Sequence, residues 1–180
     1  MIRRMTDIAT AVCLVMLAVA SARAAGTGGQ DRLTIPDVGS IGTPGKGWEW
    51  KAVKEYDPQK GGIYVCSAEG KPGKVILTID PRKIQGDKAR IAALKSHFNA
   101  LHEELQKLGC TDIKGKRPDL TPPIHEDVDY MVFGTTPKGA SVYFAGHTVF
   151  KDHTFLVQAA APSLAQTQKL AEVATTLKNP

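Results

Sequence analysis

The sequence has none of the short motifs that mark the common classes of enzyme, and it has few cysteines. It has three cysteines and no Cys-x-x-C, so a thioredoxin-like redox motif is excluded. It has no Gly-x-Ser-x-Gly for a hydrolase nucleophile. Residues 40–47 lack the first glycine and the closing Ser/Thr of a phosphate-binding loop, and residues 26–29 do not match a dinucleotide fingerprint. The sequence therefore predicts no catalytic residue and no cofactor.

Charge of one sign is not concentrated anywhere in the sequence. The full chain has a formal charge of +5, from 23 Lys and Arg and 18 Asp and Glu. Without residues 1–24, 20 basic and 17 acidic residues remain, a formal charge of +3. The basic residues are scattered among acidic ones, without the one-sided stripe that binding of a phosphate backbone requires. We therefore expect no nucleic-acid partner.

The first 24 residues have the pattern of a cleavable secretion signal. Arg3 and Arg4 precede the uncharged, largely apolar run Ile8–Ala20, and a small-x-small pattern ends at Ala24. Signal peptidase is expected to cut between Ala24 and Ala25. The sequence thus predicts an exported protein, periplasmic or secreted.

Two kinds of membrane attachment are disfavoured by the same segment. A membrane-spanning helix needs about 20 apolar residues, and this run is shorter and ends at a cleavage pattern. Cys13 lies inside the run rather than at the cleavage point, so lipid attachment is not expected. We do not expect an integral membrane protein.

The mature chain divides into an arm and one domain. Ala25–Gly47 is rich in glycine and proline and shows no hydrophobic period, which predicts a flexible arm. Residues 48–180 are expected to form a single globular domain. Alternating apolar residues and turn signals predict strands over 48–56, 63–68, 74–80, 110–114, 128–134, 140–150 and 153–161.

Two helices complete the expected domain, and the first is the clearest element in the sequence. Apolar residues at spacings of three and four predict a helix over 88–108, with Asp87 as its N-cap and Gly109 ending it. The stripe consists of Ile91, Leu94, Phe98, Leu101, Leu105 and Leu108. A second helix is expected over 164–178. Grouped strands with intervening helices indicate an α+β domain, an antiparallel sheet covered by helices.

The span from Trp48 to Lys178 resembles the Mog1/PsbP-like fold, which includes periplasmic DcrB-type lipoproteins and thylakoid PsbP proteins. The likeness rests on Pro44–Trp48 leading into paired strands, on the long helix over 88–108, and on strand, turn, strand and terminal helix over 142–178. The resemblance implies an α/β/α sandwich. The chain departs from the DcrB type because it has no lipobox cysteine. Members differ widely in role, so no functional residue is carried over.

Histidine pairs do not predict a metal site. His97 and His102 are five residues apart on a helix and therefore flank the apolar stripe on opposite sides. If residues 151–152 form a two-residue turn, Phe150 pairs with His153, which places His147 and His153 on opposite faces of the sheet.

The sequence His125-Glu126-Asp127, with Asp129, offers a cation cluster or a solvated acidic loop. Its spacing matches no calcium loop and it has no glycine for the sharp turn, which favours the loop. We therefore predict no metal-ligating residue.

Two further pairs have structural interpretations. In an exported protein an even number of cysteines favours pairing, so a Cys66–Cys110 disulfide is expected once Cys13 leaves with the signal. The alternative is that both are free thiols buried in the core. Trp48 and Trp50 share one face of a strand. Exposed, they form a binding platform; packing in the core or at its rim is favoured.

Two functions from different classes remain. The first is an exported, non-enzymatic binding or accessory module that contacts a protein or an envelope component. The second is a small extracytoplasmic hydrolase with a scattered active site. A pocket in which two or more titratable groups converge would favour the hydrolase.

Overall fold

The computed structural model describes residues 31–81, 86–116, 127–139, 141–150 and 154–178. The expected secretion signal and cleavage point lie outside these ranges. The strands are β1 (Arg32–Ile35), β2 (Gly39–Gly42), β3 (Glu49–Asp57), β4 (Gly61–Ser67), β5 (Lys74–Asp80), β6 (Thr111–Lys116), β7 (Asp127–Thr135), β8 (Ser141–Phe150) and β9 (Thr154–Ala161). The helices are α2 (Asp87–Lys107), α3 (Leu164–Ala171) and the short 3₁₀ helix η1 (Glu172–Thr176).

Seven strands form one antiparallel sheet in the order β3-β4-β5-β9-β8-β7-β6. All seven strands of this sheet were predicted from the sequence to within a few residues. The last hairpin differs in register, because Phe150 pairs with Thr154 rather than with His153. Because β9 lies between β5 and β8, the last strand of the chain occupies the centre of the sheet and joins β3–β5 to β6–β8.

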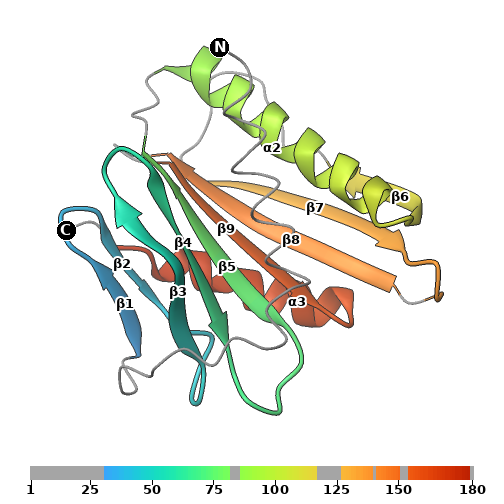
Figure 1. Cartoon of the computed structure of the whole chain (residues 1–180), viewed down its shortest axis with the longest axis horizontal. Coiled ribbons are helices and arrows are strands. Elements are labelled where there is room, and N and C mark those ends of the chain that lie inside the picture. The colour runs from blue at the N-terminus through green and yellow to red at the C-terminus, as the bar shows by residue number, and fades with distance from the viewer. Residues whose placement is uncertain (1–30, 82–85, 117–126, 140, 151–153, 179–180) are drawn as a thin grey trace.

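Helices cover both faces of the sheet. Helix α2 lies over one face and contacts β6 and β7, while α3 lies behind the sheet and contacts β5, β8 and β9 (Figure 1). The expected α+β sandwich, with an antiparallel sheet between helices, is confirmed.

The larger hydrophobic cluster lies on the α3 side of the sheet. It takes alternate residues from the central strands, because successive side chains on a strand point to opposite faces. It also takes residues from the β1–β2 hairpin and the C-terminal helices. Its members include Ile35, Val38, Ile41, Trp48, Tyr64, Cys66, Val75, Leu77, Ile79, Phe155, Val157, Ala159, Leu170, Ala171, Val173 and Ala174.

The smaller cluster joins α2 to the other end of the sheet. Its members are Phe98, Leu101, Leu105, Cys110 and Val132. The predicted apolar stripe on this helix is thus confirmed.

Glycine residues lie at both ends of helix α2. At the C-terminal end, Gly109 adopts a φ of 72°, and the N–H groups of Gly109 and Cys110 donate to the carbonyls of Gln106 and Leu105. At the other end the prediction is wrong by one residue, because Gly86 rather than Asp87 is the N-cap.

Residues 31–47 do not form the flexible arm that their composition indicated. Strands β1 and β2 pair as an antiparallel hairpin, and Ile35, Val38 and Ile41 are buried in the larger cluster. Each strand has only four residues, too few to display a hydrophobic period among the glycines and prolines. The folded part of the chain therefore includes residues before Trp48.

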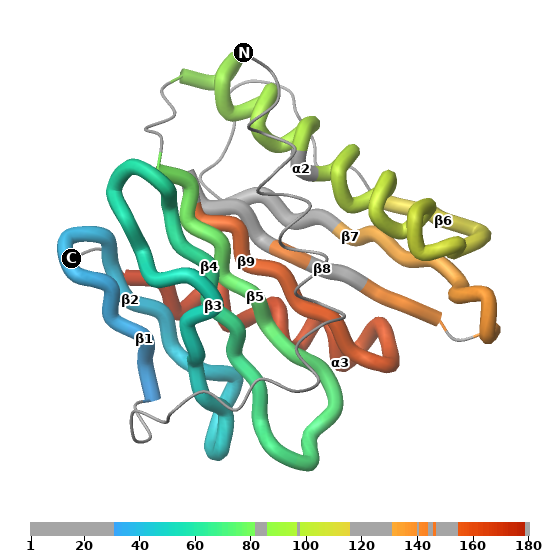
Figure 2. Tube along the Cα trace, viewed as in Figure 1, coloured from blue at the N-terminus to red at the C-terminus, as the bar shows by residue number. Residues whose placement is uncertain are grey.

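The C-terminal segment is less regular than predicted. Helix α3 ends at Ala171, η1 follows, and Lys178 forms an antiparallel bridge with Ser40 of β2. The bridge requires extended backbone at Lys178, so an α-helix through residue 178 is incompatible with it. Figure 2 shows the two ends of the described chain side by side, the hairpin in blue and η1 in red.

The expected Cys66–Cys110 disulfide is wrong: both are free, buried thiols. Cys66 lies on β4 in the larger cluster, whereas Cys110 precedes β6 in the smaller cluster. In the sheet order β4 and β6 are five strands apart, on the order of 24 Å, and a disulfide requires Cα atoms within about 7 Å. Burial, with the nearby Glu49 carboxylate, raises the pKa of the Cys66 thiol to about 12, so it is unreactive at neutral pH.

Candidate functional site

A groove of about 680 Å³ separates the β1–β2 hairpin from edge strand β3. One wall is formed by β1 and the turn after it, the other by β3, and Tyr64 of β4 contributes from the neighbouring strand. Its lining is Arg32, Leu33, Thr34, Ile35, Pro36, Asp37, Val38, Glu49, Trp50, Ala52, Glu55, Tyr56, Pro58 and Tyr64. This volume lies within the range of small-ligand pockets, so the groove is the candidate site.

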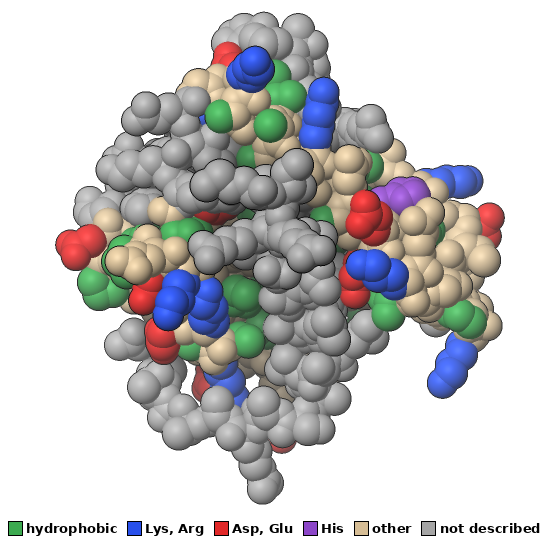
Figure 3. All heavy atoms as spheres, turned by 45° about the horizontal axis from the view of Figure 1, so that its top comes forward, with side chains coloured by type: hydrophobic (Ala, Val, Ile, Leu, Met, Phe, Trp, Pro, Cys, Tyr) green, Lys and Arg blue, Asp and Glu red, His purple; other side chains and the backbone are tan. Residues whose placement is uncertain are grey.

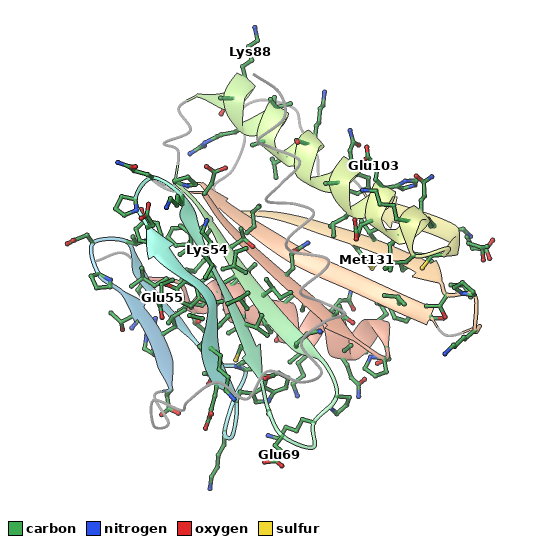
Figure 4. The ribbon with its side chains drawn as sticks, viewed as in Figure 1. Lys54, Glu55, Glu69, Lys88, Glu103 and Met131 are labelled. Atoms are coloured by element: carbon green, nitrogen blue, oxygen red, sulfur yellow. The ribbon has the colours of Figure 1, made fainter. Side chains whose placement is uncertain are left out.

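A β-bulge in β3 places Glu55 on the groove side. Trp50 and Ala52 pair with Cys66 and Tyr64, whereas Lys54 pairs with Ile63. Val53 is therefore an extra residue, and the alternation of side chains shifts by one position after it. Regular alternation would put Glu55 on the face opposite to Trp50; with the bulge both line the groove, and Glu55 projects between β3 and β1 (Figure 4).

The Glu55 carboxylate is held by a buried tyrosine. The Tyr64 hydroxyl donates to Glu55 Oε2 over 3.2 Å and accepts the backbone N–H of Tyr56 over 2.9 Å. Burial raises the pKa of the Tyr64 phenol; the Tyr56 N–H lowers this pKa, and the Glu55 carboxylate raises it. Tyr64 consequently stays protonated at neutral pH and acts as a fixed hydrogen-bond donor.

Arg32, the only basic residue in the described lining, uses one guanidinium nitrogen within the protein. Its Nη2 donates to the carbonyl of Thr176 over 2.7 Å and to the carbonyl and hydroxyl of Ser40. These bonds tie β1 to β2 and to the C-terminal η1. Arg32 therefore serves the architecture of the groove wall.

The two tryptophans pack in the core and at its rim, as favoured from the sequence. Trp48 is buried just before β3, and Trp50 is half-buried against the larger cluster. The indole N–H of Trp50 donates to the carbonyl of Gly42 over 2.8 Å, which fixes the ring between β3 and the hairpin. Trp50 also lines the groove, so the residue packs against the core and offers part of its surface to a ligand.

The groove offers carboxylates, aromatic surface and the Thr34 hydroxyl. Its described lining includes no histidine, serine or cysteine. Glu49 pairs with Ser67, and Glu55 lies one residue beyond the Lys54–Ile63 pair, so the Cα atoms of the two residues are about 17 Å apart along the strand. Paired carboxylates for glycoside hydrolysis lie about 5 to 9.5 Å apart. This arrangement suits binding of a ligand.

Most of the residues considered for metal binding lie where their side chains are not described. Within the described part of the fold, no three His, Cys, Asp or Glu side chains gather in a way that could hold a metal ion. His125, Glu126 and His153 lie outside the described residues, and for His97 and His147 only the backbone is described. The solvated loop predicted at His125–Asp129 therefore stays a prediction.

The surface agrees with the mixed charge pattern of the sequence. On the face shown in Figure 3, Lys and Arg side chains of the described residues are interspersed with Asp and Glu side chains.

Among the helices described, none combines the length and apolar character needed to cross a bilayer.

Sequence reasoning missed the groove for two reasons. One wall was assigned to a flexible arm, and a strict period of two would point Glu55 away from Trp50. The signal that was present is the cluster Glu49, Trp50, Glu55 and Tyr56, which is rich in acids and aromatics for a single strand.

Comparison with known proteins bears on the fold. No protein-family model and no curated protein matches the sequence. The structure is similar to the solution structure of cyanobacterial PsbP (CyanoP) from Synechocystis sp. PCC 6803, with a TM-score of 0.50 and 11% sequence identity. The match covers 87% of this chain and 98% of that chain. This chain therefore has the PsbP/Mog1-like fold that the sequence resemblance predicted.

Proposed function

We propose that this protein is an exported, non-enzymatic binding module that contacts a protein or envelope component through the groove between β1 and β3. The observation that carries the proposal is the groove itself, about 680 Å³ with apolar, aromatic and carboxylate side chains along it. The secretion pattern ending at Ala24 supports the compartment.

Hydrogen bonds within the protein order the side chains of the groove walls in the absence of a ligand. Tyr64 holds Glu55, Gly42 holds the Trp50 ring, and Ser40 and Thr176 hold Arg32. Side chains that are already ordered lose little conformational entropy on binding, which favours affinity. The walls therefore suit recognition by preformed shape and charge.

Photocrosslinking in a bacterial envelope tests this function. The full chain is expressed with a photoreactive amino acid in place of Ala52, which lines the groove, or of Glu103, which is exposed on α2. We expect export with cleavage after Ala24, and one dominant adduct from position 52 that position 103 does not give. Equal adducts from both positions, none from position 52, or retention of residues 1–24 would contradict the proposal.

The hydrolase alternative has one observation in its favour, the convergence of Glu55 and Tyr64 at 3.2 Å. With its pKa raised, the Tyr64 phenol stays protonated at neutral pH, and no histidine in the described lining stands beside it as a general base. Chromogenic ester and glycoside substrates distinguish the two. Turnover that both Glu55→Gln and Tyr64→Phe abolish would favour the hydrolase over the binding module.

A further inference from the structure

We infer that the groove receives an extended segment of a partner protein that carries lysine or arginine side chains. This inference rests on the proposed function and adds the chemistry of the ligand.

The groove is acidic in a chain whose formal charge is positive. Asp37, Glu49 and Glu55 line it, and Arg32 is the one lining residue of opposite sign in the described chain. Because Arg32 Nη2 is already bonded to Ser40 and Thr176, that nitrogen is engaged inside the protein. Three carboxylate residues thus face one guanidinium residue in the lining, and a cationic ligand can form charge-assisted hydrogen bonds with the carboxylates.

The apolar part of the lining suits the rest of a basic side chain. Lysine and arginine carry apolar stems that pack along aromatic and aliphatic surface, while the charged end reaches a carboxylate. Trp50 and Tyr56 provide aromatic surface on the same wall as Glu55, and an aromatic face attracts a cation. One wall therefore offers both the surface for the stem and the acceptor for the charge.

The spacing of the carboxylates favours an extended ligand over a compact one. The Cα atoms of Glu49 and Glu55 are about 17 Å apart along β3, and Asp37, in the turn after β1, also lines the groove. An extended peptide advances about 3.3 Å per residue, so basic residues at its first, third and fifth positions span about 13 Å between their Cα atoms, and long basic side chains reach the remaining distance. A single small cation reaches only one of these carboxylates.

The test uses two matched peptides and the mature chain. Acetyl-Lys-Ala-Lys-Ala-Lys-amide is titrated against the same peptide with glutamine in place of each lysine, and binding is followed by NMR shifts of backbone amides. We expect saturable shifts on β1 and β3 with the lysine peptide, at least tenfold weaker binding of the glutamine peptide, and affinity that falls as salt is raised. Shifts confined to other elements, or equal binding of both peptides, would overturn the inference.

Variants assign the binding to the groove. Glu55→Gln should weaken binding of the lysine peptide about threefold to tenfold, because it keeps the side chain's size but removes its charge. Glu103→Gln, the same change on exposed α2, should leave affinity within twofold. Asp37→Asn is the second groove variant; asparagine tolerates the φ of 59° found there. Equal losses from Glu103→Gln and the groove variants would contradict the assignment.

Two outcomes separate this inference from the proposed function. If spermidine displaces the lysine peptide at equal concentration of positive charge, a small polycation rather than a peptide is the ligand, and the inference fails. If neither peptide nor spermidine binds while position 52 still crosslinks to one component, the ligand chemistry is wrong and the binding function stands. Without binding or adduct, both fail.

Discussion

Two buried side chains at the centre of the sheet have polar atoms without hydrogen-bond partners. Thr78 of β5 is 1% exposed and Gln158 of β9 is 0% exposed, and neither the Thr78 hydroxyl nor the Gln158 amide has a partner in the described structure. Their strands are paired, and both residues lie on the face opposite to the larger cluster. Each unpaired group costs about 1 to 3 kcal/mol of stability.

Thr78 and Thr167 make a matched test of that cost. Both are buried, but the Thr167 hydroxyl donates to the Ser163 carbonyl over 2.8 Å. We expect Thr78→Val to raise the free energy of unfolding by about 1 kcal/mol and Thr167→Val to lower it by about 1 kcal/mol. Urea denaturation measures both. A loss of stability in Thr78→Val as large as that in Thr167→Val would show that Thr78 has a partner.

At the scale of the element, the bends in β3 decide what its side chains can do. The strand pairs with β4 through two register shifts. Before the first shift the even-numbered residues Trp50 and Ala52 point toward the groove, whereas after it the odd-numbered Glu55 does. Edge strands often carry such bulges, which bend the strand and re-aim a side chain. The β3–β4 hairpin is therefore both a sheet edge and a wall of the groove.

The turn that closes this hairpin depends on Gly61. Gly61 and Gly70 share a φ of 69°, but a Cβ at Gly61 would collide with the carbonyl oxygen of Ile79, whereas a Cβ at Gly70 would meet nothing within 4 Å. Gly70→Ala should therefore cost only backbone strain, about 1 kcal/mol. Gly61→Ala must also displace the end of β5 and should cost at least 3 kcal/mol.

Thermal or urea unfolding of the two glycine variants gives the comparison directly. Because the backbone dihedral is the same at both positions, the difference between the variants isolates the steric contact with β5. Equal destabilisation would mean that the turn relaxes away from Ile79 without cost.

For the whole molecule, the two ends of the described chain complete one core. The hairpin buries Ile35, Val38 and Ile41, and its β2 strand bonds to Lys178 through both backbone groups of Ser40. The hairpin also forms one wall of the groove. Loss of either terminal segment should thus weaken both the core and the site.

A chain that begins at Trp48 tests the contribution of the hairpin. Burial of each aliphatic side chain stabilises by about 1.5 to 3 kcal/mol, so removal of three should cost about 4.5 to 9 kcal/mol, a large part of the roughly 5 to 15 kcal/mol by which an ordinary domain is stable. A chain that begins at Asp31 is the control and should retain its urea midpoint. If the shorter chain does not fold, Ile41→Ala in the full mature protein should still cost about 2 to 5 kcal/mol. Equal midpoints for the two truncated chains would make the hairpin dispensable.

The sequence by itself determined the element order and fold class. The seven strands of the main sheet and the helix over 87–107 carry their periods within single segments, because burial of one face imposes spacings of two or of three and four. Only the tertiary structure decided the rest. The hairpin over 32–42 is too short to show a period and is ordered by contacts with residues more than a hundred positions away. Cys66 and Cys110 are separated by strand order, and Glu55 enters the groove through a bulge. These features depend on which distant segments meet, and local spacing does not contain that information.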